Sequence, residues 1–119
     1  MNKQNFLTLP LEPLANCHDG EGVLRHATVF PREAFRTPIS FMNYTILPPD
    51  TSIGLHTHGD DEEMYLLLEG SGEMEVNGER LPVTAGDVVV NPPFGTHALY
   101  NTSDADIRIL VLEVRNDAK

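Results

Sequence analysis

Short apolar runs, each ended by Gly, Pro, Asn or Asp, follow one another at close spacing along most of this chain. The run 39–47 has the two-residue period of a β-strand, with Asn43 and Thr45 on the same face. The same pattern predicts strands at 24–30, 62–68, 72–76, 80–83, 88–91, 96–100 and 107–114. Helical periodicity never extends beyond about two turns, so the chain is expected to be all-β, an antiparallel sandwich or barrel.

Two histidines separated by one residue, His56 and His58, lie in the middle of the chain. On one extended strand they point to the same side, so both imidazoles can reach a single ion. A turn at 59–61 follows, and because it breaks the alternation, parity alone leaves either Glu62 or Glu63 as a further ligand.

A third histidine, His97, follows the Pro-Pro-Phe-Gly turn at 92–95 and lies in the strand expected at 96–100. Three imidazoles and one carboxylate together form a typical ligand set for a divalent transition metal. The sequence therefore predicts one metal site assembled from two stretches of the chain.

These two stretches resemble the paired motifs of the cupin superfamily. The first family motif runs Gly, five residues, His-x-His, three or four residues, Glu, six residues, Gly. The second runs Gly, five residues, Pro-x-Gly, two residues, His, three residues, Asn. The matching positions are His56, His58, Glu63 and Gly70 in the first motif and Gly86, Pro92, His97 and Asn101 in the second. The chain departs from the pattern where Asp50 replaces the leading glycine and where the inner glycine is displaced to Gly95.

The resemblance implies a cupin-type jelly roll, a double-stranded β-helix barrel, with a metal inside a pocket that opens at one end. It implies His56, His58, Glu63 and His97 as the ligands, because the family spacing favours Glu63 over Glu62. We interpret Asn101 as a residue that holds a turn or strand end. Cupins commonly pair, so we expect a homodimer.

Residues 1–22 contain prolines, glycines and scattered leucines, which predict an irregular N-terminal arm on a barrel of residues 23–119. The arm could cover one apolar sheet face, and a second subunit another. His18 and His26 lie outside both motifs, so we expect them at the surface. Cys17 is interpreted as a small arm residue rather than a nucleophile.

The charge balance limits the partners, because 18 acidic residues against 8 basic ones give a net charge of -10. Such a surface repels phosphate backbones and anionic lipids, so neither nucleic acid nor a membrane is an expected partner. The acidic residues 60–62 are interpreted as a solvated turn. A single cysteine excludes an intrachain disulfide and a thiolate metal cluster. The first 17 residues do not resemble a signal peptide, and we expect a cytoplasmic protein.

The ligand set leaves up to two coordination positions for a small molecule on a manganese, iron, nickel or zinc ion. We expect a metal-dependent enzyme acting on an oxygenated small molecule, of the isomerase, epimerase, lyase or dioxygenase type. By parity, Tyr65 lies on the face of Glu63 and could carry protons, while Asn43 and Thr45 could contact the substrate. The alternative is a module that binds or senses a small molecule through the metal without converting it.

Overall fold

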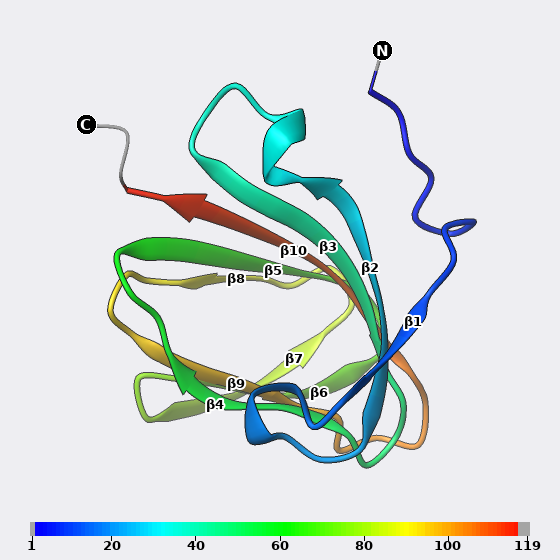
Figure 1. Cartoon of the computed structure of the whole chain (residues 1–119). Helices are drawn as coiled ribbons and strands as arrows, with labels where there is room; N and C mark the ends of the chain where they lie inside the picture. The colour runs from blue at the N-terminus through cyan, green and yellow to red at the C-terminus, as the bar shows by residue number, and fades with distance from the viewer. Residues whose placement is uncertain (1, 117–119) are drawn as a thin grey trace.

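The structure of the protein is a computed structural model that describes residues 2–116. Within these residues, two antiparallel sheets face each other (Figure 1). The six-stranded sheet has the order β1-β2-β3-β10-β5-β8, and the four-stranded sheet has the order β4-β9-β6-β7. The all-β class predicted from the sequence is confirmed. Residues 1 and 117–119, at the outer ends of the predicted arm and barrel, lie outside the described residues.

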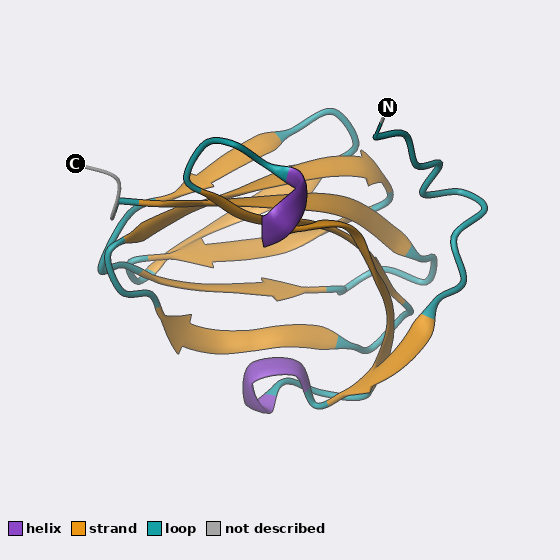
Figure 2. Cartoon of the chain, turned by 45° about the horizontal axis from the view of Figure 1, so that its top comes forward, coloured by secondary structure: helices purple, strands orange, loops and turns teal. Residues whose placement is uncertain are grey.

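The strands have the following bounds: β1 Glu12–Ala15, β2 Val23–Pro31, β3 Ile39–Leu47, β4 Ser52–Thr57, β5 Asp61–Glu69, β6 Ser71–Val76, β7 Glu79–Thr84, β8 Val88–Asn91, β9 Thr96–Tyr100 and β10 Ile107–Arg115. Two short 3-10 turns, η1 (Cys17–Asp19) and η2 (Arg32–Ala34), are the only helical segments in the described part (Figure 2). No described helix has the length and apolar character that crossing a membrane requires.

The barrel interior is filled by the inward faces of both sheets, which alternate with outward faces along each strand. Leu24, Leu47, Leu99, Ile107 and Ile109 have no exposed side-chain surface and form the centre of this cluster. Buried polar residues, among them Glu63, Asn91 and His97, interrupt this apolar filling and belong to the site described below.

The N-terminal segment covers part of the outer face of the six-stranded sheet. Phe6, Leu9 and Leu11 pack against an outer cluster that includes Tyr44 and Ile46. The expectation of an entirely irregular arm is wrong, because β1 pairs with β2 from Glu12 opposite His26 to Ala15 opposite Val23. The open edge of β2 offers unpaired backbone groups to this segment, and the resulting ladder satisfies them.

Both departures from the family motifs lie at turns with left-handed backbone. Asp50, in place of the leading glycine, has φ 62°, and Phe94, in place of the inner glycine, has φ 60°. Aspartate tolerates this region better than most residues, whereas for a bulky residue such as Phe94 it is unusual. The turn geometry is therefore kept although the glycines are absent.

Candidate metal centre

Three of the four predicted ligands lie on strands β4, β5 and β9, and the fourth, His58, follows the end of β4. His56 on β4 lies directly opposite His97 on β9, and Glu63 lies near the start of β5. The expectation that His56 and His58 share one strand needs correction, because β4 ends at Thr57. His58 is instead fixed by a hydrogen bond from its backbone N–H to the carbonyl of Gly95, 2.9 Å away.

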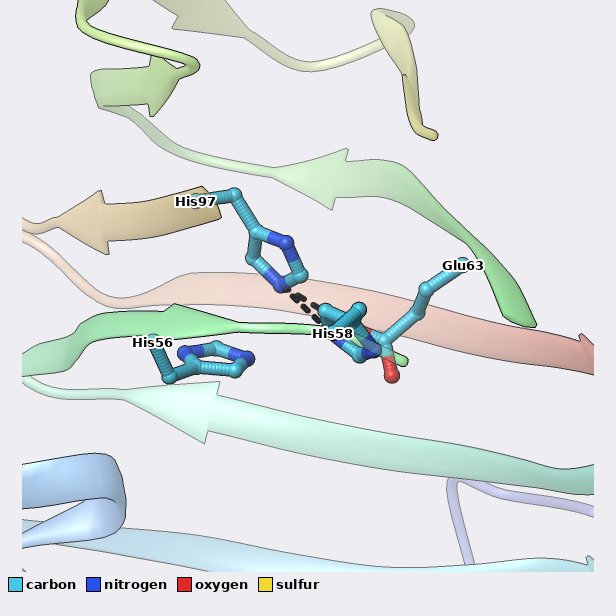
Figure 3. A group of neighbouring side chains, drawn as sticks. All are labelled: His56, His58, Glu63 and His97. Atoms are coloured by element: carbon cyan, nitrogen blue, oxygen red, sulfur yellow. Dashed lines mark hydrogen bonds and ion pairs between the residues drawn. The ribbon is translucent and has the colours of Figure 1, made fainter. Parts of the chain in front are cut away.

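The ligand atoms of His56, His58, Glu63 and His97 all lie within 4.8 Å of one another (Figure 3). Glu63 Oε1 is 3.1 Å from His97 Nε2 and 3.4 Å from His58 Nε2, and the two Nε2 atoms are 3.3 Å apart. Two donors at right angles around an ion about 2.2 Å away would be separated by about 3.1 Å. The observed separations are close to this value, so the arrangement fits a divalent transition-metal ion.

The second ring nitrogens of two histidines are engaged in a way that leaves Nε2 for an ion. His56 Nδ1 donates to the carbonyl of Gly54 at 2.7 Å, and His58 Nδ1 donates to Asp61 Oδ1 at 3.0 Å. Such partners fix the tautomer and the ring orientation. Burial lowers the pKa of His56 to about 4, so its ring is neutral at physiological pH, as a ligand must be.

The acidic turn does not remain fully solvated as expected, because Asp61 accepts the hydrogen bond from His58. Glu113 on β10 also approaches His58, with its Oε1 3.6 Å from Nδ1. Burial, followed by the charges of Asp61 and Glu63, raises the pKa of Glu113 to about 7. Sequence spacing did not identify Glu113, because it faces the site only through the pairing of β10 with β5.

Asn91 is a second residue that the sequence analysis did not single out. It ends β8 directly opposite Glu63 and is 1% exposed. Neither side-chain polar atom of Asn91 has a hydrogen-bond partner among the described residues. A buried polar amide at this position, where a core strand usually carries an apolar residue, is the signal that could have identified it.

A cavity of about 390 Å³ adjoins the metal cluster at Glu63. Glu63 and Tyr65 border it on the side of the cluster, and Asn43 and Thr45 line it farther along the six-stranded sheet. All four lie on the predicted faces of their strands. The volume is in the range of small-molecule sites.

The Tyr65 phenol connects the cluster to the cavity. Its hydroxyl oxygen is 3.3 Å from His97 Nε2, and the side chain is almost fully buried. Burial, reinforced by the negative charge of Glu63, raises the pKa of Tyr65 well above its ordinary value. The hydroxyl is therefore protonated over the physiological range.

The opposite wall of the cavity is the segment 14–18, which carries β1 into η1. His18 is exposed as expected, yet its ring stacks on that of His56 with centroids 3.7 Å apart. We expected His26 at the surface, and this expectation is wrong. The residue is half-buried and lines the cavity, with Nδ1 3.0 Å from Thr45 Oγ1. Neither histidine belongs to a motif, so spacing could not place them here.

Asn101 has the role expected of it, away from the cluster. Its amide nitrogen donates to the carbonyls of Leu47 and Ala105, each 2.8 Å away, and its carbonyl oxygen accepts from Ser103. The residue thus holds the loop before β10 to the end of β3.

Comparisons with known proteins agree with this geometry. A family model described as a cupin domain matches residues 43–113. An oxalate-binding protein of Thermotoga maritima is 32% identical over 101 residues, covering 85% of this chain and 84% of that protein. The crystal structure of a predicted oxalate decarboxylase from Thermotoga maritima superimposes with a TM-score of 0.89 and 29% identity, covering 92% of this chain and 95% of that one.

A more distant relative is an enzyme. The 5-nitrosalicylic acid 1,2-dioxygenase of a Bradyrhizobium species is 30% identical over 76 residues, which make up 64% of this chain but only 36% of that protein. The matched region of the family model includes both metal-site stretches, β3 from Asn43 onward, all of β5, and β10 up to Glu113. The predicted jelly-roll barrel is confirmed.

Proposed function

This chain belongs to the cupin family, and from that premise we propose that it binds one divalent transition metal through His56, His58, Glu63 and His97. The ion, manganese, iron, nickel or zinc, would hold an oxygenated small molecule in the adjoining cavity. We further propose that the protein is an enzyme of the isomerase, epimerase, lyase or dioxygenase type.

One observation carries this proposal: four ligand atoms lie within 4.8 Å of one another, and one of the four residues, Glu63, also lines a cavity of about 390 Å³. A metal site that no small molecule could reach would only stabilise the fold. Here Glu63 belongs to both the donor set and the cavity lining, so a molecule in the cavity could reach the ion. The hydrogen bonds from the Nδ1 atoms of His56 and His58 keep the donor atoms aimed at one point.

The metal would supply Lewis acidity that polarises a carboxylate, carbonyl or hydroxyl group. The chain's own residues would bind and orient the molecule. Tyr65, whose protonated hydroxyl lies beside His97 and which lines the cavity, would deliver a proton to the bound molecule. Thr45 and Asn43 would contact the part of the molecule that lies away from the metal. The apolar side chains of Phe41 and Val111 would exclude water from its carbon atoms.

A second candidate function is binding without conversion, and a relative named for oxalate binding favours it. Oxalate is a small chelating anion, which suits an ion with two neighbouring open positions. Both functions need the same metal site. They differ only in whether the bound molecule changes.

The test uses the protein loaded in turn with manganese, iron(II), nickel or zinc. Each form is incubated with oxalate, a keto acid and a hydroxy acid, with and without oxygen, and the protein-free filtrate is followed by ¹³C NMR. Product that requires the metal supports the enzyme, and saturable binding by calorimetry without product supports the binding module. If the metal-loaded protein binds and converts none of them, both candidates are wrong for these ligand classes.

A homodimer remains a proposal that the outer face of the six-stranded sheet supports. Val88 and Val90 on the edge strand β8 are 61% and 52% exposed, and Leu68 on β5 is 39% exposed. A second subunit would remove this apolar surface from water. Light scattering of the purified chain should give twice the monomer mass of 13.2 kDa, and the monomer mass would contradict the proposal.

A further inference from the structure

The cavity is much longer than a two-carbon acid. Thr45 on β3 and Glu63 on β5 are separated by β10, so they lie two strands apart. Ile109 of β10 pairs with both Thr45 and Leu67, which places Thr45 level with a residue four positions beyond Glu63 on β5. At about 4.8 Å per strand and 3.3 Å per residue, the two backbone positions are roughly 16 Å apart. After allowance for the two side chains, roughly 10 Å remain. Oxalate spans only about 4 Å between its outer oxygens and would fill one end.

The far end of the cavity carries neutral hydrogen-bonding groups. His26 Nδ1 and Thr45 Oγ1 are 3.0 Å apart, and both residues line the cavity together with Asn43. Burial lowers the pKa of His26, so the ring is neutral at physiological pH. A neutral imidazole and a hydroxyl can each donate and accept, which is the pattern that an alcohol group matches.

The electrostatics of the cavity disfavour a second anionic group. None of the described residues that line it is a lysine or an arginine, while Glu63 lines it and the chain as a whole carries a net charge of -10. A dicarboxylate or phosphate tail would be buried without a cation. Leu14, Phe41, Ile53 and Val111 supply the apolar part of the lining, which suits the carbon atoms of a chain.

We infer that the ligand is a polyhydroxylated monocarboxylic acid, with its carboxylate and neighbouring hydroxyl at the metal and a distal hydroxyl at His26 and Thr45. This inference rests on the proposed metal-dependent binding and names the ligand class for it. The inferred ligand differs from oxalate because it has a tail of four to five carbon atoms, which would occupy the rest of the cavity.

The experiment compares three acids with the same chelating head on the metal-loaded protein by calorimetry. D-Gluconate carries the hydroxylated tail, 2-hydroxyhexanoate carries a tail of equal carbon number without hydroxyls, and glycolate has no tail. We expect gluconate to bind at least tenfold more tightly than glycolate, with 2-hydroxyhexanoate between them. Equal affinity for gluconate and glycolate overturns the inference but leaves the metal-dependent binding intact. Binding of none of the three by the loaded protein overturns both.

Two variants test whether the far end causes the preference. Thr45→Val and His26→Phe each remove a polar group while keeping the approximate shape, and each should lower gluconate affinity about tenfold while glycolate affinity stays within twofold. Thr102→Val makes the same chemical change as Thr45→Val at an exposed position outside the cavity lining and should change neither. A gluconate preference that survives in every folded variant overturns the inference. The comparison on the unaltered protein decides it if neither variant folds.

Discussion

The two walls of the cavity are built in different ways. On the metal wall Glu63 borders the cavity, and it belongs to a set of donors on β5, β9, β4 and just after β4, whose spacing is fixed by strand pairing. The arm wall, residues 14–18, contains the end of β1 and then turns through left-handed backbone at Asn16 and His18. Regular strands hold a ligand set with fixed geometry, whereas an irregular segment can change without disturbing that set. We therefore assign metal affinity to the first wall, and we expect the second to affect binding of the ligand's tail without changing metal affinity.

The largest effect is expected from His97→Ala on the metal wall. His97 is 1% exposed and its Nε2 lies beside Glu63, His58 and Tyr65, so the change removes a donor at the centre of the cluster. Metal affinity, measured by competition with a chromophoric chelator, should fall more than about 100-fold, which exceeds the usual effect of removing a residue that only hydrogen-bonds to a ligand. An affinity within threefold of the unaltered protein would remove His97 from the ligand set.

The arm wall should respond differently, and Gly54→Ala tests this. A Cβ at Gly54 would collide with the carbonyl oxygen of His18 and the backbone nitrogen of Gly20, so η1 must move away from β4. We expect a loss of about 2 kcal/mol in the free energy of unfolding and weaker gluconate binding. Alanine keeps the backbone carbonyl that accepts the His56 hydrogen bond, so metal affinity should stay within about threefold.

The matched control is Gly59→Ala, because a Cβ at Gly59 meets nothing within 4 Å. It should leave both the denaturant midpoint and gluconate binding unchanged. If Gly54→Ala instead releases the metal as His97→Ala does, the two walls are not separable and the comparison fails.

A smaller and more selective effect is expected from Tyr65→Phe. The phenol hydroxyl is 3.3 Å from His97 Nε2 but is not one of the four donors, so the metal should remain bound. Any turnover found for the metal-loaded protein should fall about 100-fold, the usual contribution of a positioned proton carrier. Tyr44→Phe, on the outer face of the same sheet, is the control. Unchanged turnover would exclude the proton-transfer role.

The alkylation rate of Cys17 should show whether a ligand lies along the arm wall. This is the smallest effect that we expect, and it needs no substitution. Burial, followed by the charge of Glu63, raises the pKa of the Cys17 thiol, so little thiolate is present at neutral pH. Iodoacetamide should alkylate it at least about tenfold more slowly than free cysteine at pH 7.5, with the rate rising as pH increases. Gluconate bound to the metal-loaded protein should slow the reaction further. Protection by glycolate to the same extent would contradict a tail that lies along this wall.

The sequence predicted the metal wall better than the arm wall for a physical reason. Strand periodicity and family spacing determine which residues of β5 and β9 face inward, so Glu63, Tyr65 and His97 could be placed together. Glu113 and Asn91 reach the same site only through pairing between strands far apart in sequence, which no local pattern encodes. The arm wall depends on left-handed residues and on a close backbone approach between Gly20 and Gly54. Such contacts are tertiary, and residues 14–18 show no periodicity that could reveal them.

The most direct test of the account is elemental analysis of the purified protein by plasma mass spectrometry, beside a His58→Ala variant prepared identically. We expect about one equivalent of a single transition metal per chain in the unaltered protein and little metal in the variant, because His58 Nε2 lies within the four-donor cluster. No uptake by either protein after incubation with manganese, iron(II), nickel and zinc would contradict the metal site. Equal metal content in both proteins would show that the ion is held elsewhere.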